Sequence, residues 1–398
     1  MSQVVSYRQR MLAAIDCRLA PGQVPCSFML YNGLKESCRS YLEFIQRQLD
    51  LGLDAYIQIP PRPPEIVSDT YNLHGLPVCY HPSVVVREWK DAANADLPGE
   101  RWPLLIKEYH TPAGILRAEV YQDSTWCYGD HVPFLDDYLE SRSRRFIINE
   151  PQDLSALAYL LVPPTLEEQQ SFRQESQLAI EFARQNDLLL AGGWGVGADM
   201  LAWIYGLQRM VFLAYDQPQF LQDLLALIAG WNQARMQVVL EAGVDLYIKR
   251  AWYENCDFWT PQTWRQFILP TLRAEVQLAH ENGARFGYLI TSNCMPLLES
   301  IAEAGVDVVI GVDPHRWDLQ LACQKLAGRV CLWGGVNGHL TVETGRQQDV
   351  RQEVQLAFQA LGESGGWILS PVDNVRTDSP EVRLNVMALI EQWKALVG

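Results

Sequence analysis

Apolar runs that follow a glycine recur along this chain, each after a stretch with helical spacing. The clearest follow Gly52, Gly243 and Gly305, and two looser copies follow Gly283 and Gly328. A glycine can take the left-handed conformation that ends a helix, and the apolar run behind it suits a strand buried on both faces. This repeated order predicts a β/α barrel or a doubly wound sheet. Chemistry is then expected at the C-terminal ends of the strands.

The same pattern gives the expected elements. We expect helices over residues 5–16, 40–51 and 165–186, and a helix that starts at Thr260-Pro261, with a hydroxyl at the N-cap and proline in the first turn. Strands are expected at 26–31, 55–59, 188–191, 245–249, 285–290, 307–311, 330–333 and 366–370.

Between residues 66 and 150 the pattern changes to short alternating runs separated by Pro, Gly and Asp. Ser83–Glu88 and Ile115–Tyr121 are typical of antiparallel hairpins, and Glu108–Arg117 is interpreted as a turn that opens into a strand. We interpret 66–150 as an insertion on a barrel, so that residues 1–398 form a single domain.

Composition narrows the classes of function. The net charge of −15 argues against a nucleic-acid partner, and no apolar run reaches the roughly 18–20 residues that span a bilayer. The first 20 residues contain no signal-peptide core. Nine cysteines without a CxxC pair indicate a reducing compartment. We therefore expect a soluble, cytoplasmic protein with neither a nucleic-acid nor a membrane partner.

The glycine-rich stretch 192–197 lacks the lysine-serine ending of a phosphate-binding loop. Its glycines more readily allow the backbone to approach a ligand or a neighbouring strand, which makes Trp194 a candidate ligand contact. Asp199, just behind it, is expected to face solvent.

The segment Lys249–Trp259 gathers aromatic, cationic and carboxylate side chains where a core strand ends. Such a mixture is typical of a ligand-pocket wall. The alternative is an aromatic lid on the barrel rim, with Glu254 paired to Arg250. The candidate substrate-binding residues here are Arg250, Trp252, Tyr253 and Glu254.

Polar groups also follow the last three predicted strands. His315 suits acid or base chemistry near neutral pH, or it is an exposed residue that caps the next helix. Gly334-Gly335 favours a ligand close to the backbone. Asp373 is the best single catalytic candidate, because it combines a strand-end position with expected partial burial. The further candidates for substrate binding are Asp313, Asn337, Asn374 and Arg376.

For a metal, Cys294, His315 and Asp373 could converge, but their spacing matches no zinc pattern. We therefore predict no metal ligands and no resident cofactor.

Several segments resemble the uroporphyrinogen decarboxylase superfamily, which includes the zinc-dependent corrinoid and coenzyme M methyltransferases. The resemblance covers residues 150–395 well and 1–60 loosely, and it implies a (β/α)8 barrel, a TIM barrel, with a cleft at its C-terminal face. The insertion of short β-hairpins at 66–150 is poorly matched. The segments that carry it are Glu303–Val312, Gly334–Asn337, Val350–Leu361, Gly366–Val375 and Asp378–Glu381.

The chain departs from the superfamily at the residues that bind the superfamily's substrate or zinc. Leucines stand in Pro25–Leu34 where the porphyrin-binding arginines belong, and the histidine of the last strand falls on Asp373. The zinc-binding His-x-Cys pair of the methyltransferases falls on Leu289 and Thr291, and the later cysteine falls near Ser370. The resemblance therefore indicates a diverged paralogue without the porphyrin-binding arginines and without the zinc-ligand motif.

The leading hypothesis is a metal-independent, decarboxylase-like lyase that acts on a carboxylated small molecule. Asp373 would move the proton, Tyr288 and His315 would assist, and Arg250 or Arg376 would hold a substrate carboxylate. One alternative is a corrinoid-dependent methyltransferase that receives methylcobalamin from a partner corrinoid protein. Another is a non-catalytic barrel that binds a planar, tetrapyrrole-type ligand. A homodimer is compatible with the superfamily.

Overall fold

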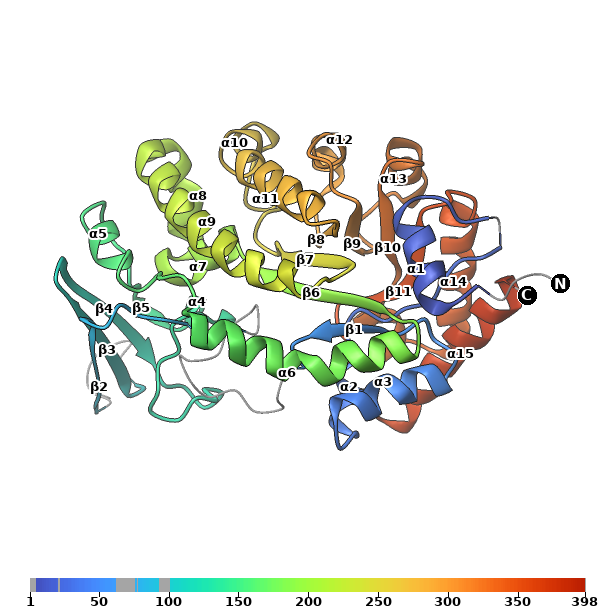
Figure 1. Cartoon of the computed structure of the whole chain (residues 1–398), viewed down its shortest axis with the longest axis horizontal. Helices are drawn as coiled ribbons and strands as arrows, with labels where there is room; N and C mark the ends of the chain where they lie inside the picture. The colour runs from blue at the N-terminus through green and yellow to red at the C-terminus, as the bar shows by residue number, and fades with distance from the viewer. Residues whose placement is uncertain (1–4, 21, 62–75, 77, 93–100, 398) are drawn as a thin grey trace.

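The structure is a computed structural model that describes residues 5–20, 22–61, 76, 78–92 and 101–397. A curled sheet of seven parallel strands forms its centre, in the order β1-β6-β7-β8-β9-β10-β11 (Figure 1). The order follows the sequence, as in a TIM barrel, and confirms the expected fold class. The strands are β1 (Tyr56–Ile59), β6 (Leu189–Gly195), β7 (Leu246–Arg250), β8 (Arg285–Leu289), β9 (Val308–Val312), β10 (Cys331–Asn337) and β11 (Trp367–Val372).

The segment 25–31 lies between β11 and β1 and takes the place of an eighth strand. Cys26 and Leu369 form an isolated parallel bridge, and the Cys26 carbonyl accepts the Asp54 N–H at 2.7 Å. The continuous strand expected at 26–31 is wrong, because the Met29 N–H bonds the Ser370 hydroxyl instead of a backbone carbonyl. This irregular backbone leaves room at the mouth of the barrel.

Helices cover the outside of the sheet. Thr260 caps α10 as expected, its hydroxyl accepting the Thr263 N–H at 3.1 Å, and Thr165 caps α6 in the same way. No helix of the described residues is long and apolar enough to cross a membrane. The covering helices are α2 (Asn32–Glu36), α3 (Tyr41–Asp50), α6 (Leu166–Gln185), α7 (Ala198–Tyr205), α8 (Leu207–Asp216), α9 (Pro218–Glu241), α10 (Pro261–Phe267), α11 (Leu269–Glu281), α12 (Leu298–Glu303), α13 (Leu319–Leu326), α14 (Gln347–Leu361) and α15 (Pro380–Val397), with a 3-10 turn at Met295–Leu297 and a π-helical turn at Gly338–Glu343.

Helix α1 (Tyr7–Ile15) closes the N-terminal end of the barrel. Its Met11 and Ile15 belong to the core cluster that fills the barrel interior, and Arg10 donates to Asp54 at 2.6 Å. With that end closed, the C-terminal end is where a ligand can enter.

The glycines that precede the strands have the predicted conformation. Their φ values are +83° at Gly52, +77° at Gly243, +76° at Gly283, +87° at Gly305 and +71° at Gly328. These positive values confirm that each preceding helix ends on a left-handed residue.

The inserted region contains a second, antiparallel sheet in the order β2-β3-β4-β5. The turn expected in Glu108–Arg117 consists of Pro112-Ala113, and residues 108–111 already belong to a strand. Residues 66–75, 77 and 93–100 of the predicted insertion lie outside the described residues. In Figure 1 this sheet lies at the opposite end of the molecule from α1 and α15. Its elements are β2 (Val85–Asp91), β3 (Leu104–Thr111), β4 (Gly114–Tyr121), α4 (Asp137–Glu140) and β5 (Ser143–Arg145), followed by α5 (Asp153–Leu157).

Candidate functional site

A cavity of about 380 Å³ opens at the C-terminal end of the barrel. It lies among the ends of β1, β6 and β7 and the segment that replaces the eighth strand. This is where TIM barrels carry their active sites, and the volume falls within the range of ligand pockets, roughly 300–1,000 Å³. Its walls are mainly aromatic and amide side chains. They are Phe28, Met29, Leu30, Tyr31, Asn32, Lys35, Tyr41, Phe44, Gln48, Tyr56, Gln58, Pro60, Trp194, Arg250, Trp252 and Asn374.

Four of the predicted site residues line this cavity: Trp194, Arg250, Trp252 and Asn374. Trp194 does so because β6 continues through the glycine-rich stretch that we expected to be a loop. The pairing of β6 with β7 shifts between Gly193 and Gly195, and Trp194 has a φ of +68°. Such a bulge redirects one side chain, and Trp194 joins the barrel interior.

Arg250 is the cation at the end of β7. Its Nη2 donates to the two carboxylate oxygens of Asp137 at 2.7 and 2.6 Å, and its Nε lies 2.8 Å from Asp199. Its guanidinium also stacks over Trp252, 3.9 Å from the ring centroid. The expected pair between Arg250 and Glu254 is therefore wrong. Two aspartates fix the guanidinium at the cavity wall instead.

Asp199 is buried, with a relative exposure of 0%, and does not face solvent as expected. It stands in the first turn of α7, where the helix dipole favours a carboxylate, and accepts the Tyr253 N–H at 2.8 Å. Burial raises its pKa to about 6, an effect that Arg250 opposes and Glu254 reinforces. Asp199 is thus a buried acid whose pKa lies well above the usual range of an aspartate.

Asp137, in α4 of the predicted insertion, is the second carboxylate that binds Arg250. Besides Arg250, it accepts the indole N–H of Trp203 at 2.9 Å and the hydroxyl of Tyr253 at 3.2 Å. Its side chain is 39% exposed, whereas that of Asp199 is fully buried. Arg250 therefore has one buried carboxylate partner, Asp199, and one partner that solvent can reach, Asp137. Tyr253 is held beside them and is absent from the cavity lining.

Glu254 and Tyr288 belong to a different, buried cluster between the barrel and its helices. The Tyr288 hydroxyl donates to Glu254, whose other oxygen caps α7 by accepting the Ala198 N–H at 3.0 Å. Lys249 lies 3.6 Å from Glu254 and donates to Glu275 at 2.7 Å. Burial alone would lower the pKa of Lys249, but these two glutamates raise it. Burial, reinforced by Glu254, raises the pKa of Tyr288 well above 10.

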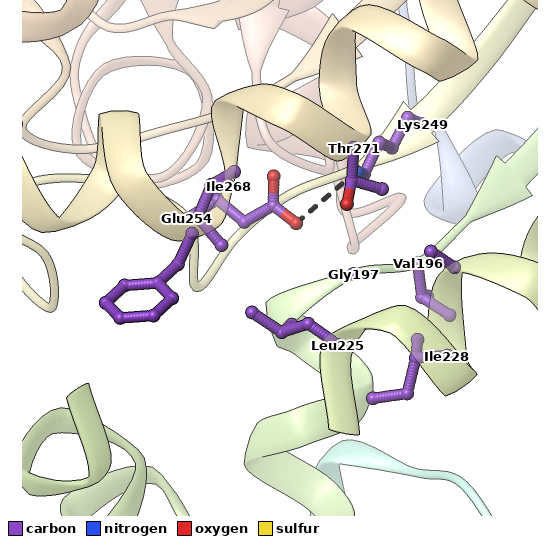
Figure 2. A pocket seen from close by; sticks show the side chains of 10 residues that line it. Val196, Gly197, Leu225, Ile228, Lys249, Glu254, Ile268 and Thr271 are labelled. Atoms are coloured by element: carbon purple, nitrogen blue, oxygen red, sulfur yellow. Dashed lines mark ion pairs between the residues drawn. The ribbon is translucent and has the colours of Figure 1, made fainter. Parts of the chain in front are cut away.

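A small cavity of about 10 Å³ adjoins this cluster (Figure 2). The figure shows the Lys249–Glu254 ion pair together with the apolar side chains of Leu225, Ile228 and Ile268. The volume is close to that of a single water-sized probe. The structure therefore places Tyr288 and Glu254 in a charged, closed cluster outside the large cavity.

A third group lies at the ends of β9, β10 and β11. Asn337 donates from Nδ2 to both oxygens of Asp313 at 3.1 and 3.2 Å. His315 donates its backbone N–H to Asp313, and its ring lies 2.9 Å from Glu353. The histidine ring is 44% exposed. His315 is therefore exposed at the rim of the barrel, but the expectation that it caps the next helix is wrong, because Asp318 caps α13.

Asp373 is exposed and not partly buried as expected. It has a φ of +67°, a conformation that aspartate tolerates better than most residues. Desolvation by the crowded strand ends raises its pKa, and neighbouring Asp313 raises it further. The next residue, Asn374, lines the cavity and accepts the Asn32 N–H at 3.0 Å. Asp373 therefore combines access to water with a strengthened hold on its proton.

Two other expectations at strand ends require correction. Arg376 is held by Glu343 at 3.0 Å, close to His339, and does not line the cavity. A side chain at Gly334 would meet the Val312 backbone, and one at Gly335 would meet Trp367. These glycines therefore allow strands and helices to approach each other, not a ligand.

The zinc chemistry of the superfamily does not fit these residues. Leu289 is buried in the barrel interior. The Ser370 hydroxyl is occupied by the Pro371 carbonyl and the Met29 N–H. Cys294 is buried with its thiol against the Thr291 carbonyl, and the described part of the chain has no group of three or more residues able to hold a metal ion.

Most of the lining residues from the N-terminal part of the chain were not predicted. Gln58 lies near the C-terminal end of β1 and was identifiable by that position, whereas Tyr56 begins the strand. Lys35 and Tyr41 come from helices, and Asp137, which contacts Arg250 without lining the cavity, comes from the predicted insertion, so no strand-end signal marks them.

Comparison with known proteins supports the fold. Residues 149–395 match the family described as "Uroporphyrinogen decarboxylase (URO-D)". A methyltransferase from Methanosarcina mazei has a similar structure, with a TM-score of 0.59, 16% identity and 99% of each chain covered. A B12-independent methionine synthase from Shewanella sp. W3-18-1 is more distant, with a TM-score of 0.41, 9% identity and coverage of 54% of this chain and 64% of its own.

A comparison with curated protein sequences finds no significant match. The family match nevertheless covers more than half of the chain and coincides with the barrel from α5 to α15. The chain therefore belongs to the uroporphyrinogen decarboxylase (URO-D) family.

Proposed function

We propose that this protein is an enzyme that binds a small carboxylated molecule in the 380 Å³ cavity and acts on it by acid–base chemistry. The reaction type that we favour is decarboxylation. The observation that carries the proposal is Arg250, a guanidinium at the cavity wall whose accessible partner, Asp137, is itself a carboxylate.

A substrate carboxylate would bind by replacing Asp137 on Arg250. Guanidinium and carboxylate form strong, directional pairs, and Asp199 would keep Arg250 in place during the exchange. The indole faces of Trp194 and Trp252 would hold the flat or apolar part of the substrate. The cavity lies at the lower end of the usual volume range, which favours a small acid over a tetrapyrrole.

Asp373 does not itself line the cavity, but it precedes the lining residue Asn374, and we propose it as the proton donor at the cavity mouth. In a decarboxylation the bond to the carboxylate carbon breaks and carbon dioxide leaves. The electron pair of the broken bond remains on the substrate carbon. A proton from Asp373 then forms the new C–H bond, and water returns a proton to the exposed Asp373 side chain. The raised pKa of Asp373 keeps more of it protonated than an ordinary aspartate. Asp313 and Asn337 would position this end of the barrel, and His315 would exchange protons at the rim.

The test is release of carbon dioxide from a panel of aromatic mono- and dicarboxylic acids. Asp373→Asn should lower turnover of any accepted acid by about 10²-fold or more, the usual loss for a general acid. Asp349→Asn, on the exposed face of α14, is the matched control and should leave turnover unchanged. Full activity of Asp373→Asn on such an acid would contradict the assignment, and bound acids recovered unaltered would favour a binding protein.

A second candidate is methyl transfer from a corrinoid. It is motivated by the similarity over the whole chain to a protein described as a methyltransferase. In this reading methylcobalamin would come from a partner corrinoid protein. Titration with methylcobalamin, followed by its visible absorbance, decides between the two: saturable binding would favour methyl transfer, and no binding would favour the acid-binding proposal.

A further inference from the structure

The large cavity extends along helix α3, away from the end of β7. Three residues of this helix line it, Tyr41, Phe44 and Gln48. They are three and seven residues apart, so they share one face of the helix, and together they span about 10 Å of it. The cavity therefore has a second wall, on α3, that contacts another part of any ligand that fills it.

Gln48 lies at the inner end of this wall. The Tyr41 hydroxyl accepts the Gln58 N–H at 2.8 Å, in the second half of β1. The Gln48 carbonyl accepts the Leu53 N–H at 3.0 Å, before β1 begins. Arg250 is the last residue of β7, which runs parallel to β1 within the sheet. Tyr41 is therefore on the side of the mouth and of Arg250, and Gln48 is deeper in the barrel.

The Gln48 side chain is buried but has no hydrogen bond. Its relative exposure is 3%, and within the part of the chain that the structure describes no residue pairs with its amide. A buried amide without a partner destabilises a protein, and native structures satisfy nearly all such groups. A polar group of a ligand in the cavity would supply the partner that Gln48 lacks.

The wall around Gln48 is uncharged. Among the described residues of α3 and β1 that line the cavity, all are aromatic or amide side chains. The Tyr56 hydroxyl is already used, because it donates to the Met29 carbonyl at 2.9 Å. A charged group would lose its water here without gaining an opposite charge from this wall, whereas an amide can both donate to and accept from a neutral group. Gln48 therefore suits a hydroxyl or an amide of the ligand.

We propose that Gln48 determines specificity by binding a hydroxyl or amide group at the end of the substrate that lies away from its carboxylate. The inference rests on the proposed function for the carboxylate at Arg250, and it narrows the substrate class to elongated aromatic acids with a neutral hydrogen-bonding group at the far end. A site that hydrogen-bonds such a group rejects the analogue without it, because the buried amide is then left unpaired.

Isothermal titration with matched acids tests the proposal. 6-Hydroxy-2-naphthoate and 2-naphthoate differ only in the far hydroxyl, and 4′-hydroxybiphenyl-4-carboxylate and biphenyl-4-carboxylate form a longer pair. We expect the hydroxyl to raise the affinity within at least one pair by about tenfold. Gln48→Met keeps a side chain of similar length without the amide, and it should abolish this gain but leave the affinity for the unsubstituted acid. Gln46→Met, at an exposed position of α3, is the matched control and should keep the gain.

The outcomes separate this inference from the proposed function. Acids that bind with no gain from the hydroxyl, or a gain that Gln48→Met retains, would overturn the inference and leave the carboxylate site intact. Equal losses for both acids of a pair in Gln48→Met would also overturn it, because they would show a structural role.

A neutral ligand covers the case in which the carboxylate site fails. If no acid binds, binding of 2-naphthol that Gln48→Met abolishes and Arg250→Met preserves would support Gln48 and overturn only the proposed function. If neither the acids nor 2-naphthol bind, both proposals are overturned.

Discussion

The proposed function depends most on Arg250 and its two aspartate partners. Asp137 and Asp199 bind the same guanidinium, but one is 39% exposed and the other is fully buried. An exposed ion pair contributes little stability, whereas a buried charge left without its partner is costly. In the proposed function the two contacts therefore have different roles: Asp199 would position Arg250, and Asp137 would stand where the substrate carboxylate binds.

Asp137→Asn tests this difference. The variant removes the competing charge but keeps an oxygen that can accept from Trp203 and Tyr253. We expect affinity for an aromatic carboxylate to rise by about two- to fivefold, the equivalent of a partly exposed ion pair. Isothermal titration measures it, with Asp130→Asn in the same insertion as the control. A weaker or unchanged affinity would show that Asp137 does not compete with the ligand.

Asp199 makes stability depend on pH. Its pKa is about 6 in the folded protein, above the ordinary 3.8, so the folded state holds a proton that the unfolded chain has lost between these values. The contribution of Asp199 to the free energy of unfolding therefore falls as the pH rises from 3.8 to about 6. Asp199→Asn imitates the protonated form and should remove that slope, a difference of about 3 kcal/mol at most. Urea unfolding of both proteins at about pH 4 and pH 7 measures it; parallel changes would contradict the raised pKa.

Strand β6 carries Trp194 into the cavity, and it depends on close approach of two backbones. Gly193 has a φ of +124°, and a side chain there would collide with the Ile248 carbonyl. The bulge at this point is what allows Trp194 to turn inward. The cavity wall therefore depends on the glycine as much as on the tryptophan.

Gly193→Ala should destabilise the protein by about 2 kcal/mol or more, since both backbone strain and a steric clash oppose it. Gly230→Ala is the matched control, because this glycine lies within α9 with nothing within 4 Å of an added side chain. It should stabilise the protein by about 0.5–1 kcal/mol through helix propensity. Equal effects of the two substitutions in urea unfolding would contradict the role assigned to Gly193.

For the molecule as a whole, the alternation of helix, glycine and strand predicted a β/α barrel or a doubly wound sheet, and the resemblance to the superfamily then favoured the barrel. The same rule located Trp194, Arg250, Trp252 and Asn374, because the ends of parallel strands meet at one edge. Periodicity located the segment 26–31 as a strand but could not show that it is irregular, since a serine hydroxyl replaces a ladder bond there.

Contacts between residues that lie far apart along the chain could not be predicted from the sequence either. Asp137 and Arg250 are separated by 113 residues, and no local pattern relates an insertion to a strand end. The burial of Asp199 and the exposure of Asp373 likewise depend on how α7 and β11 pack. A strand-end position identified Asp373 but not its surroundings, and Asp199 was expected only to face solvent.

The proposed function requires that a carboxylate binds at Arg250 in the barrel mouth. The most direct measurement is the shift in melting temperature caused by benzoate and phthalate, compared with their neutral amides, in the wild type, in Arg250→Met and in the surface control Arg346→Met. We predict that the acids raise the melting temperature of the wild type and of Arg346→Met, that the amides do not, and that Arg250→Met loses the response. An equal response to acids and amides, or a full response in Arg250→Met, would contradict the account.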